Sequence, residues 1–260
     1  MAGDMQFVEV TRTDRVTTIT LNRPRVMNAV NPAMHEELQV AFDDFSADSE
    51  QHIAVVTGAG NRAFCAGSDL KERDPDRAYP KNGYAGLIER FDLNKPVIAA
   101  VNGLALGGGF EIALACDIII AAETATFGLP EPLVGLVARG GGLHRLPRQI
   151  GLKAAMGIIL SSRRVSAEEG RALGFVNEVV PADLLDGAVR RWCDDILRAS
   201  PMAIRASKDT VMRGLSERDV ASAMQRQSSW KAFIELEASE DAREGAKAFM
   251  EKRPAIWKGR

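Results

Sequence analysis

The sequence has little of what several common enzyme classes need. Its 260 residues include only three histidines and three cysteines. His35, His52 and His144 have no second ligand at metal-binding spacing, so no metal site is predicted. The cysteines are odd in number and far apart, which indicates reduced thiols in the cytoplasm rather than disulfides or a zinc site.

A strong net charge and long apolar runs are missing as well. The formal net charge is −2, so bulk electrostatics attract neither nucleic acid nor an anionic membrane. No apolar run approaches the length of a membrane span, and the first ten residues lack the basic-then-apolar order of a signal peptide. We therefore expect a cytoplasmic protein without a nucleic-acid or membrane partner.

What the sequence does have is an alternation of strand and helix patterns. A helix is expected to begin at Asn31-Pro32, and amphipathic helical stretches follow one another from Pro181 to Lys252. This alternation favours an α/β fold, with a helical last quarter whose apolar stripes are suited to contact another subunit. Strands are predicted at 7–10, 16–21, 53–57, 96–101 and 117–121.

The run from Gly58 to Ala63 matches the G-x-G-x-x-[GA] pattern of dinucleotide-binding folds. That pattern should open a helix, whereas here a second small-residue segment follows at 64–68. We expect a plain turn. An NAD-dependent dehydrogenase stays a remote alternative, which a titration with NADH would decide.

A second glycine run has clearer chemical meaning. Gly107, Gly108 and Gly109 precede the apolar stretch 110–116, so a helix is expected to begin there with bare backbone amides at its positive end. Such amides can stabilise an oxyanion. Glu111 stands in the first turn of this helix, where a proton-transfer role and a capping role are equally compatible with its position.

A second carboxylate stands between two prolines in an otherwise apolar segment. Pro130 and Pro132 restrict the backbone on either side of Glu131 and fix the direction of its side chain. The alternative is a glutamate in a surface turn, but 133–136 offers no polar face for it. Two glutamates in apolar settings favour proton transfer, because burial raises a carboxyl pKa toward neutral pH.

Three motifs together closely resemble the crotonase (enoyl-CoA hydratase/isomerase) superfamily. They are two oxyanion-loop motifs and a second-carboxylate motif, at 64–71, 95–111 and 127–131. The similarity extends over nearly the whole chain, from 21–24 to 251–254. Within the superfamily, the run at 107–111 and the ending at 257–260 are most similar to the carnitinyl-CoA dehydratase branch.

The resemblance implies an α/β fold with a crotonase-like ββα spiral core over 1–198 and a helical trimerisation region over 199–260, assembled as a homotrimer or a dimer of trimers. It implies no separate cofactor, since coenzyme A is carried as part of an acyl-CoA thioester substrate. Two carboxylates and two backbone amides are implied as the catalytic set: Glu111, Glu131, Ser68 and Gly108. The implied coenzyme A contacts, the last two from a neighbouring subunit, are Arg25, Val26, Met27, Ala66, Asp69, Leu70, Lys71, Phe249 and Lys252.

The activity implied is that of an enoyl-CoA hydratase-type hydro-lyase, which adds or removes water across the α,β double bond of the thioester. Carnitinyl-CoA dehydration is one form of it. Glu131 would handle the α-proton, and Glu111 would activate the water or assist hydroxide departure. A double-bond isomerase and a non-catalytic CoA-thioester-binding subunit are the alternatives, and the presence of both glutamates favours hydration.

Two segments leave the identity of the substrate's acyl group undetermined. Arg139 stands where similar hydratases carry proline and small residues, and it either lines the acyl pocket or turns to solvent. A cation in the pocket would disfavour a trimethylammonium substrate. The segment from Asp74 to Gly86, with its Pro, Gly and charged residues, is expected to be a mobile loop that shapes the pocket.

Overall fold

The computed structural model describes residues 5–72 and 78–260. It divides into two compact units, of which the first comprises the chain up to Phe91 together with Val97–Arg190. The second comprises Asp92–Pro96 and Arg191–Arg260. The functional division predicted at 198/199 stays a prediction. No helix among the described residues is long and apolar enough to cross a membrane.

Six strands form the larger sheet of the first unit. The first two pair antiparallel as the predicted hairpin, and the others pair parallel. The central strands β3, β5 and β7 are buried almost throughout, which explains their continuous apolar runs. In spatial order the strands are β1 (Val8–Thr13), β2 (Val16–Leu21), β3 (Ile53–Gly58), β5 (Val97–Val101), β7 (Ile118–Ala122) and β10 (Glu178–Val180).

A smaller sheet is built from the strands that follow the central three. After β3, β5 and β7 the chain adds β4, β6 and β8, respectively, to the second sheet, where these three lie parallel. The chain therefore winds repeatedly through both sheets, as the predicted ββα spiral requires. The members of this sheet are β4 (Ala63–Cys65), β6 (Leu104–Leu106), β8 (Thr126–Gly128) and β9 (Val165–Ser166).

The turn between β3 and β4 contains the glycine pattern that matched a dinucleotide-binding fingerprint. A strand follows that pattern, and no helix begins there. The expectation of a plain turn is confirmed, and the feature on which the NAD alternative depended is missing from this segment.

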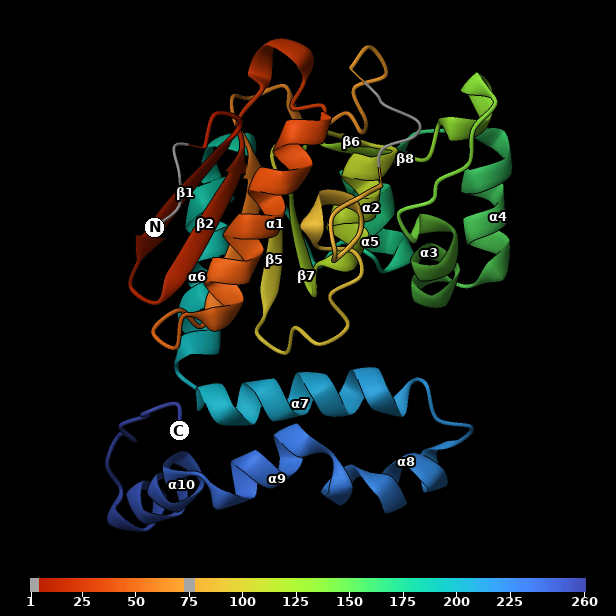
Figure 1. The fold of residues 1–260 in the computed structure, drawn as a ribbon. Helices are drawn as coiled ribbons and strands as arrows, with labels where there is room; N and C mark the ends of the chain where they lie inside the picture. The colour runs from red at the N-terminus through yellow and green to blue at the C-terminus, as the bar shows by residue number, and fades with distance from the viewer. Residues whose placement is uncertain (1–4, 73–77) are drawn as a thin grey trace. The chain divides into compact units, whose positions relative to one another are not determined.

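Helices cover the sheets of the first unit, as Figure 1 shows for α1 (Pro32–Ala47). The Asn31 side chain caps α1 by accepting a 2.9 Å hydrogen bond from the Met34 amide, as predicted. The Ser166 side chain caps α5 in the same way, through the Glu169 amide. The other helices and 3₁₀ turns of this unit are η1 (Pro24–Val26), η2 (Tyr84–Gly86), α2 (Gly108–Ala115), η3 (Glu131–Val134), α3 (Gly142–Ile150), α4 (Leu152–Ser161), α5 (Ala167–Leu173) and η4 (Ala182–Leu184).

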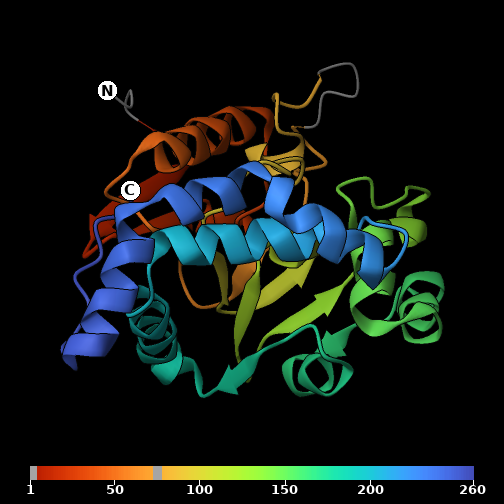
Figure 2. The same cartoon turned by 90° about the horizontal axis from the view of Figure 1, so that it is seen from below.

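The second unit is helical, as expected. The unit boundary falls within α6 (Leu185–Leu197), and α7 and α9 lie side by side (Figure 2). The buried Asp241 carboxylate accepts hydrogen bonds from the Ser200 hydroxyl and the Lys258 amide, which joins α7, α10 and the last residues of the chain. The helices are α7 (Pro201–Gly214), α8 (Val220–Arg226), η5 (Gln227–Ser229), α9 (Lys231–Ala238) and α10 (Glu240–Glu251).

Candidate active site

The two predicted oxyanion segments lie against each other at the start of α2. A Cβ atom on Gly109 would overlap the Cys65 carbonyl oxygen, so the end of β4 packs directly on the backbone of the helix. A Cβ on Gly67 would lie 3.3 Å from the Gly108 nitrogen. Gly67 and Gly108 therefore lie next to each other, an approach that only glycine permits. Ser68, which follows Gly67 directly in the sequence, is thereby brought close to Gly108 although the two are 40 positions apart.

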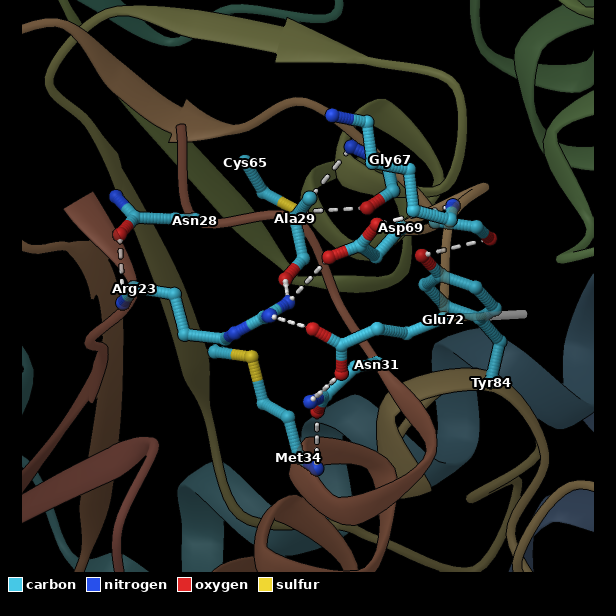
Figure 3. A network of polar contacts seen from close by, with 12 residues as sticks. Arg23, Asn28, Ala29, Asn31, Met34, Cys65, Gly67, Asp69, Glu72 and Tyr84 are labelled. Atoms are coloured by element: carbon cyan, nitrogen blue, oxygen red, sulfur yellow. Dashed lines mark hydrogen bonds and ion pairs between the residues drawn. The ribbon is translucent and has the colours of Figure 1, made fainter. Parts of the chain in front are cut away.

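A network of polar contacts holds the loop that carries Ser68 (Figure 3). The Arg23 guanidinium donates to the Ala29 carbonyl oxygen at 2.7 Å, to Asp69 Oδ2 at 2.9 Å and to Glu72 Oε1 at 2.8 Å. Asn31 Nδ2 donates to the other oxygen of Glu72. Because the Arg23 side chain is only 9% exposed, these charge-assisted bonds restrain the loop more than surface ion pairs would.

The first carboxylate, Glu111, is buried and hydrogen-bonded. It lies in the first turn of α2, and its Oε1 accepts a 2.8 Å hydrogen bond from the Gly142 amide at the start of α3. Burial raises the pKa of Glu111, while the amides of Gly142 and Gly140 and the charge of Arg145 oppose that rise. The simple capping interpretation is insufficient, since the carboxylate accepts its hydrogen bond from another segment.

The second carboxylate, Glu131, is the first residue of η3, and its environment differs. Its Oε2 is buried and has no hydrogen-bond partner among the described residues. Burial, reinforced by the negative charge of Glu111, raises the pKa of Glu131 to about 7. A Cβ on Gly107 would lie 2.7 Å from Glu131 Oε1, so this carboxylate borders the same glycine run.

This arrangement can divide acid and base chemistry at neutral pH. Amide donors and a nearby cation favour the ionised form of Glu111, whereas Glu131 has a pKa about equal to the working pH and no donor on Oε2. Two amides beside them can receive negative charge from a substrate oxygen. The site is therefore suited to moving protons next to a polarised carbonyl group.

The predicted coenzyme A residues fall into three groups. Met27 and Ala66 are joined by a 3.0 Å hydrogen bond from the Ala66 amide to the Met27 carbonyl, which links two predicted segments. Asp69 uses its side chain in the ion pair with Arg23. The other predicted contacts are exposed. In the first unit these are Arg25, Val26, Leu70 and Lys71, and in the second unit they are Phe249 and Lys252.

Four residues near the site were missed by the sequence interpretation. They act through contacts between distant segments: Arg23, Tyr84, Gly142 and Arg145. For Gly142 a signal existed, since a third glycine run stands at 140–142. No comparable pattern marks Arg23 or Tyr84.

Two segments left the identity of the acyl group undetermined, and the one around Arg139 lies within the described residues. Arg139 is exposed, in agreement with the solvent-facing alternative. Of the expected mobile loop 74–86, residues 74–77 lie outside the described residues, and 84–86 forms the turn η2.

Comparison with known proteins agrees with this geometry. The sequence model of the enoyl-CoA hydratase/isomerase family matches residues 11–260. Carnitinyl-CoA dehydratase of Proteus mirabilis is 41% identical, over 98% of this chain and 99% of that protein. Among solved structures, an enoyl-CoA hydratase from Mycobacterium tuberculosis is 38% identical with a TM-score of 0.91, covering 98% of this chain and 99% of that one. Another, from Bacillus anthracis, is 37% identical with a TM-score of 0.89, covering 98% and 100%.

The fold and the site thus define a crotonase-fold protein with two glutamates beside one glycine run. The chain belongs to the enoyl-CoA hydratase/isomerase family. It is an enzyme of the hydratase type, a lyase, as the sequence predicted.

Proposed function

We propose that this enzyme adds water to, or removes it from, the α,β double bond of an acyl-CoA thioester, with Glu111 and Glu131 as its acid–base pair. The observation that carries the proposal is the difference between the two carboxylates: Glu111 accepts the Gly142 amide hydrogen bond, and Glu131 has a pKa of about 7. An isomerase needs only one proton shuttle, so two differently tuned carboxylates favour hydration.

In the hydration direction the thioester oxygen accepts hydrogen bonds from the amides of Ser68 and Gly108. The ionised Glu111 removes a proton from a water molecule, which adds to the β-carbon. Negative charge moves to the thioester oxygen, where the two amides stabilise it. Protonated Glu131 then delivers its proton to the α-carbon. Dehydration follows the same steps in reverse.

For the acyl group we propose a small enoyl group, with crotonobetainyl-CoA as the first candidate. The relative from Proteus mirabilis is named carnitinyl-CoA dehydratase. The exposure of Arg139 removes the objection that a buried cation would repel a trimethylammonium group.

The proposal also includes how coenzyme A is bound, how the subunits assemble, and where the enzyme works. Coenzyme A would contact the exposed residues of η1 and of the 66–71 loop, and Phe249 and Lys252 would reach it from a neighbouring subunit. Several large apolar side chains of the second unit are exposed, as a trimer or a dimer of trimers would need: Val211, Leu215, Val220, Met224 and Ile234. The proposed enzyme needs no cofactor beyond the coenzyme A of its substrate and works in the cytoplasm.

The test is the loss of conjugated-thioester absorbance with crotonyl-CoA and, separately, with crotonobetainyl-CoA. We expect rapid loss with the wild-type enzyme and almost none with Glu131→Gln. The matched control is Glu123→Gln, because Glu123 is an exposed carboxylate of the same unit. Binding of both thioesters without loss of absorbance would contradict hydration and favour isomerisation.

A further inference from the structure

A buried tyrosine lies against both segments that carry the proposed oxyanion amides. Tyr84 is 3% exposed, and its Oη lies 3.3 Å from Ser68 Oγ (Figure 3). A Cβ atom on Gly108 would overlap both Oη and Cζ of Tyr84, so the phenol end of the ring contacts the start of α2. The hydroxyl therefore borders the position that a thioester oxygen would occupy.

The hydrogen of this hydroxyl is available to a ligand. Ser68 Oγ donates to Tyr84 Oη, which leaves the phenol hydrogen to be donated elsewhere. Within residues 5–72 and 78–260, no acceptor other than Ser68 Oγ itself lies at hydrogen-bond distance from this hydroxyl. Buried hydroxyl groups normally have an acceptor, and the oxygen of a bound thioester would supply one.

The backbone around Tyr84 is held in an unusual conformation. Gly83, Ala85 and Gly86 all have positive φ angles, of 74°, 56° and 58°. A non-glycine residue such as Ala85 adopts this conformation only where its surroundings enforce it, and such positions cluster at functional sites. Here the Ala85 amide donates to His35 Nδ1 at 2.9 Å.

Packing fixes the ring itself. The His35 and Tyr84 rings meet edge to face with centroids 4.5 Å apart. Burial raises the pKa of Tyr84 well above its usual value, so the phenol keeps its hydrogen throughout the working range. The donor is thus neutral, fixed in position and present before substrate arrives.

We propose that Tyr84 is a further catalytic residue whose hydroxyl donates a third hydrogen bond to the thioester oxygen, beside the amides of Ser68 and Gly108. The Ser68 hydroxyl positions it, and donation from Ser68 also polarises the phenol. This inference rests on the proposed function, because the oxygen in question is that of the enoyl thioester.

The first test compares Tyr84→Phe with Tyr79→Phe. Tyr79 is the other of the two tyrosines in the sequence and contacts the same ring cluster, but it is 45% exposed. We expect Tyr84→Phe to lower kcat by about 10- to 100-fold with KM changed less than about 3-fold, because the bond strengthens in the transition state. Tyr79→Phe should leave both constants unchanged.

A spectroscopic measurement separates this role from a structural one. The carbonyl stretching band of a bound, ¹³C-labelled enoyl thioester moves to lower frequency as the carbonyl becomes polarised. We expect Tyr84→Phe to reverse part of that shift, and Tyr79→Phe to retain all of it. A ring that only fills space would keep the shift unchanged in both variants.

Ser68→Ala provides a second variant, since it removes the hydroxyl and keeps the amide. We expect a kcat loss of about 3-fold in the wild-type background and none in the Tyr84→Phe background, since both act through one bond. Wild-type hydration together with an unchanged kcat and carbonyl band in Tyr84→Phe would overturn the role of Tyr84 alone. Failure of the wild-type enzyme to hydrate enoyl thioesters would overturn the proposed function as well.

Discussion

The start of α2 and the turn η3 each present one glutamate to the same site, yet they hold it in opposite ways. At α2 the carboxylate of Glu111 is buried and accepts an amide hydrogen bond from another helix. At η3 the carboxylate of Glu131 is partly exposed as a residue, but its Oε2 is buried without a partner. The difference teaches that one type of acid can serve as base and as acid when the environments of its two copies differ: amides of another segment and the charge of Arg145 oppose the rise in the pKa of Glu111, whereas Oε2 of Glu131 has no donor.

Replacement of each glutamate by glutamine would test this comparison most strongly. We expect Glu131→Gln and Glu111→Gln each to lower kcat for hydration by roughly 10³-fold, since glutamine can neither deliver nor accept the proton. Steady-state kinetics with crotonyl-CoA measures the loss. Glu123→Gln should stay within about 2-fold of wild type.

The same two variants should differ in stability. Glu111→Gln is expected to lower the free energy of unfolding by about 1–2 kcal/mol, because charged acceptors of backbone amides are lost. Glu131→Gln should leave stability equal or raise it, since it removes a carboxyl group whose raised pKa opposes folding when the group ionises at neutral pH. Urea denaturation measures both; equal destabilisation would show that the two environments do not differ as described.

The packing around Glu111 can be broken without touching a titratable group. A Cβ on Gly140 would lie 2.5 Å from Glu111 Oε2, so Gly140→Ala must displace the carboxylate. We expect kcat to fall by about 10- to 100-fold, because a misplaced base loses much of its effect. The control is Gly157→Ala in α4, where nothing lies within 4 Å of the added methyl group. That variant should remain active and be slightly more stable.

The pH dependence of hydration should reflect the two environments. Hydration needs Glu131 protonated, so kcat/KM should fall tenfold per pH unit above an apparent pKa near 7. It also needs Glu111 ionised, which gives a rising limb at lower pH. Because the carboxylates interact, both values belong to the pair. A rate that instead rises through pH 7 would reverse the proposed roles of acid and base.

Features that depend on neighbours in the sequence were predicted well. The hairpin 7–21, the Asn31 cap and the helix at Gly108 follow from local patterns, and the structure confirms them. The glycine run also indicated bare amides at a helix start. The sequence could therefore predict the fold class, and its motifs identified both glutamates.

Features that depend on distant segments could not be predicted in this way. The bond from Gly142 to Glu111 joins residues 31 apart, and that from Arg23 to Glu72 joins residues 49 apart. The Tyr84 side chain contacts Gly108, 24 positions away in the sequence, and residues with positive φ angles stand next to both, at Gly83 and Gly107. Such contacts depend on the tertiary arrangement, which the spacing of residues does not encode.

Replacement of Arg145 should have the smallest effect on the difference between the two carboxylates, because it changes only the pKa of Glu111. Its charge lowers the pKa of Glu111 and does not act appreciably on Glu131. Arg145→Gln should therefore move the rising limb of the pH profile to higher pH and leave the falling limb near 7 in place. At every pH on the rising limb kcat/KM should therefore be lower than in the wild-type enzyme, with the sign set by the smaller ionised fraction of Glu111.

The matched control is Arg148→Gln, an exposed arginine on the same helix α3. Its pH profile should coincide with that of the wild-type enzyme. Because Arg145 also donates to the Ile88 carbonyl oxygen, a general loss of structure would lower the rate equally at every pH. Only a shift confined to the rising limb identifies Arg145 as the charge that keeps Glu111 ionised while Glu131 holds its proton.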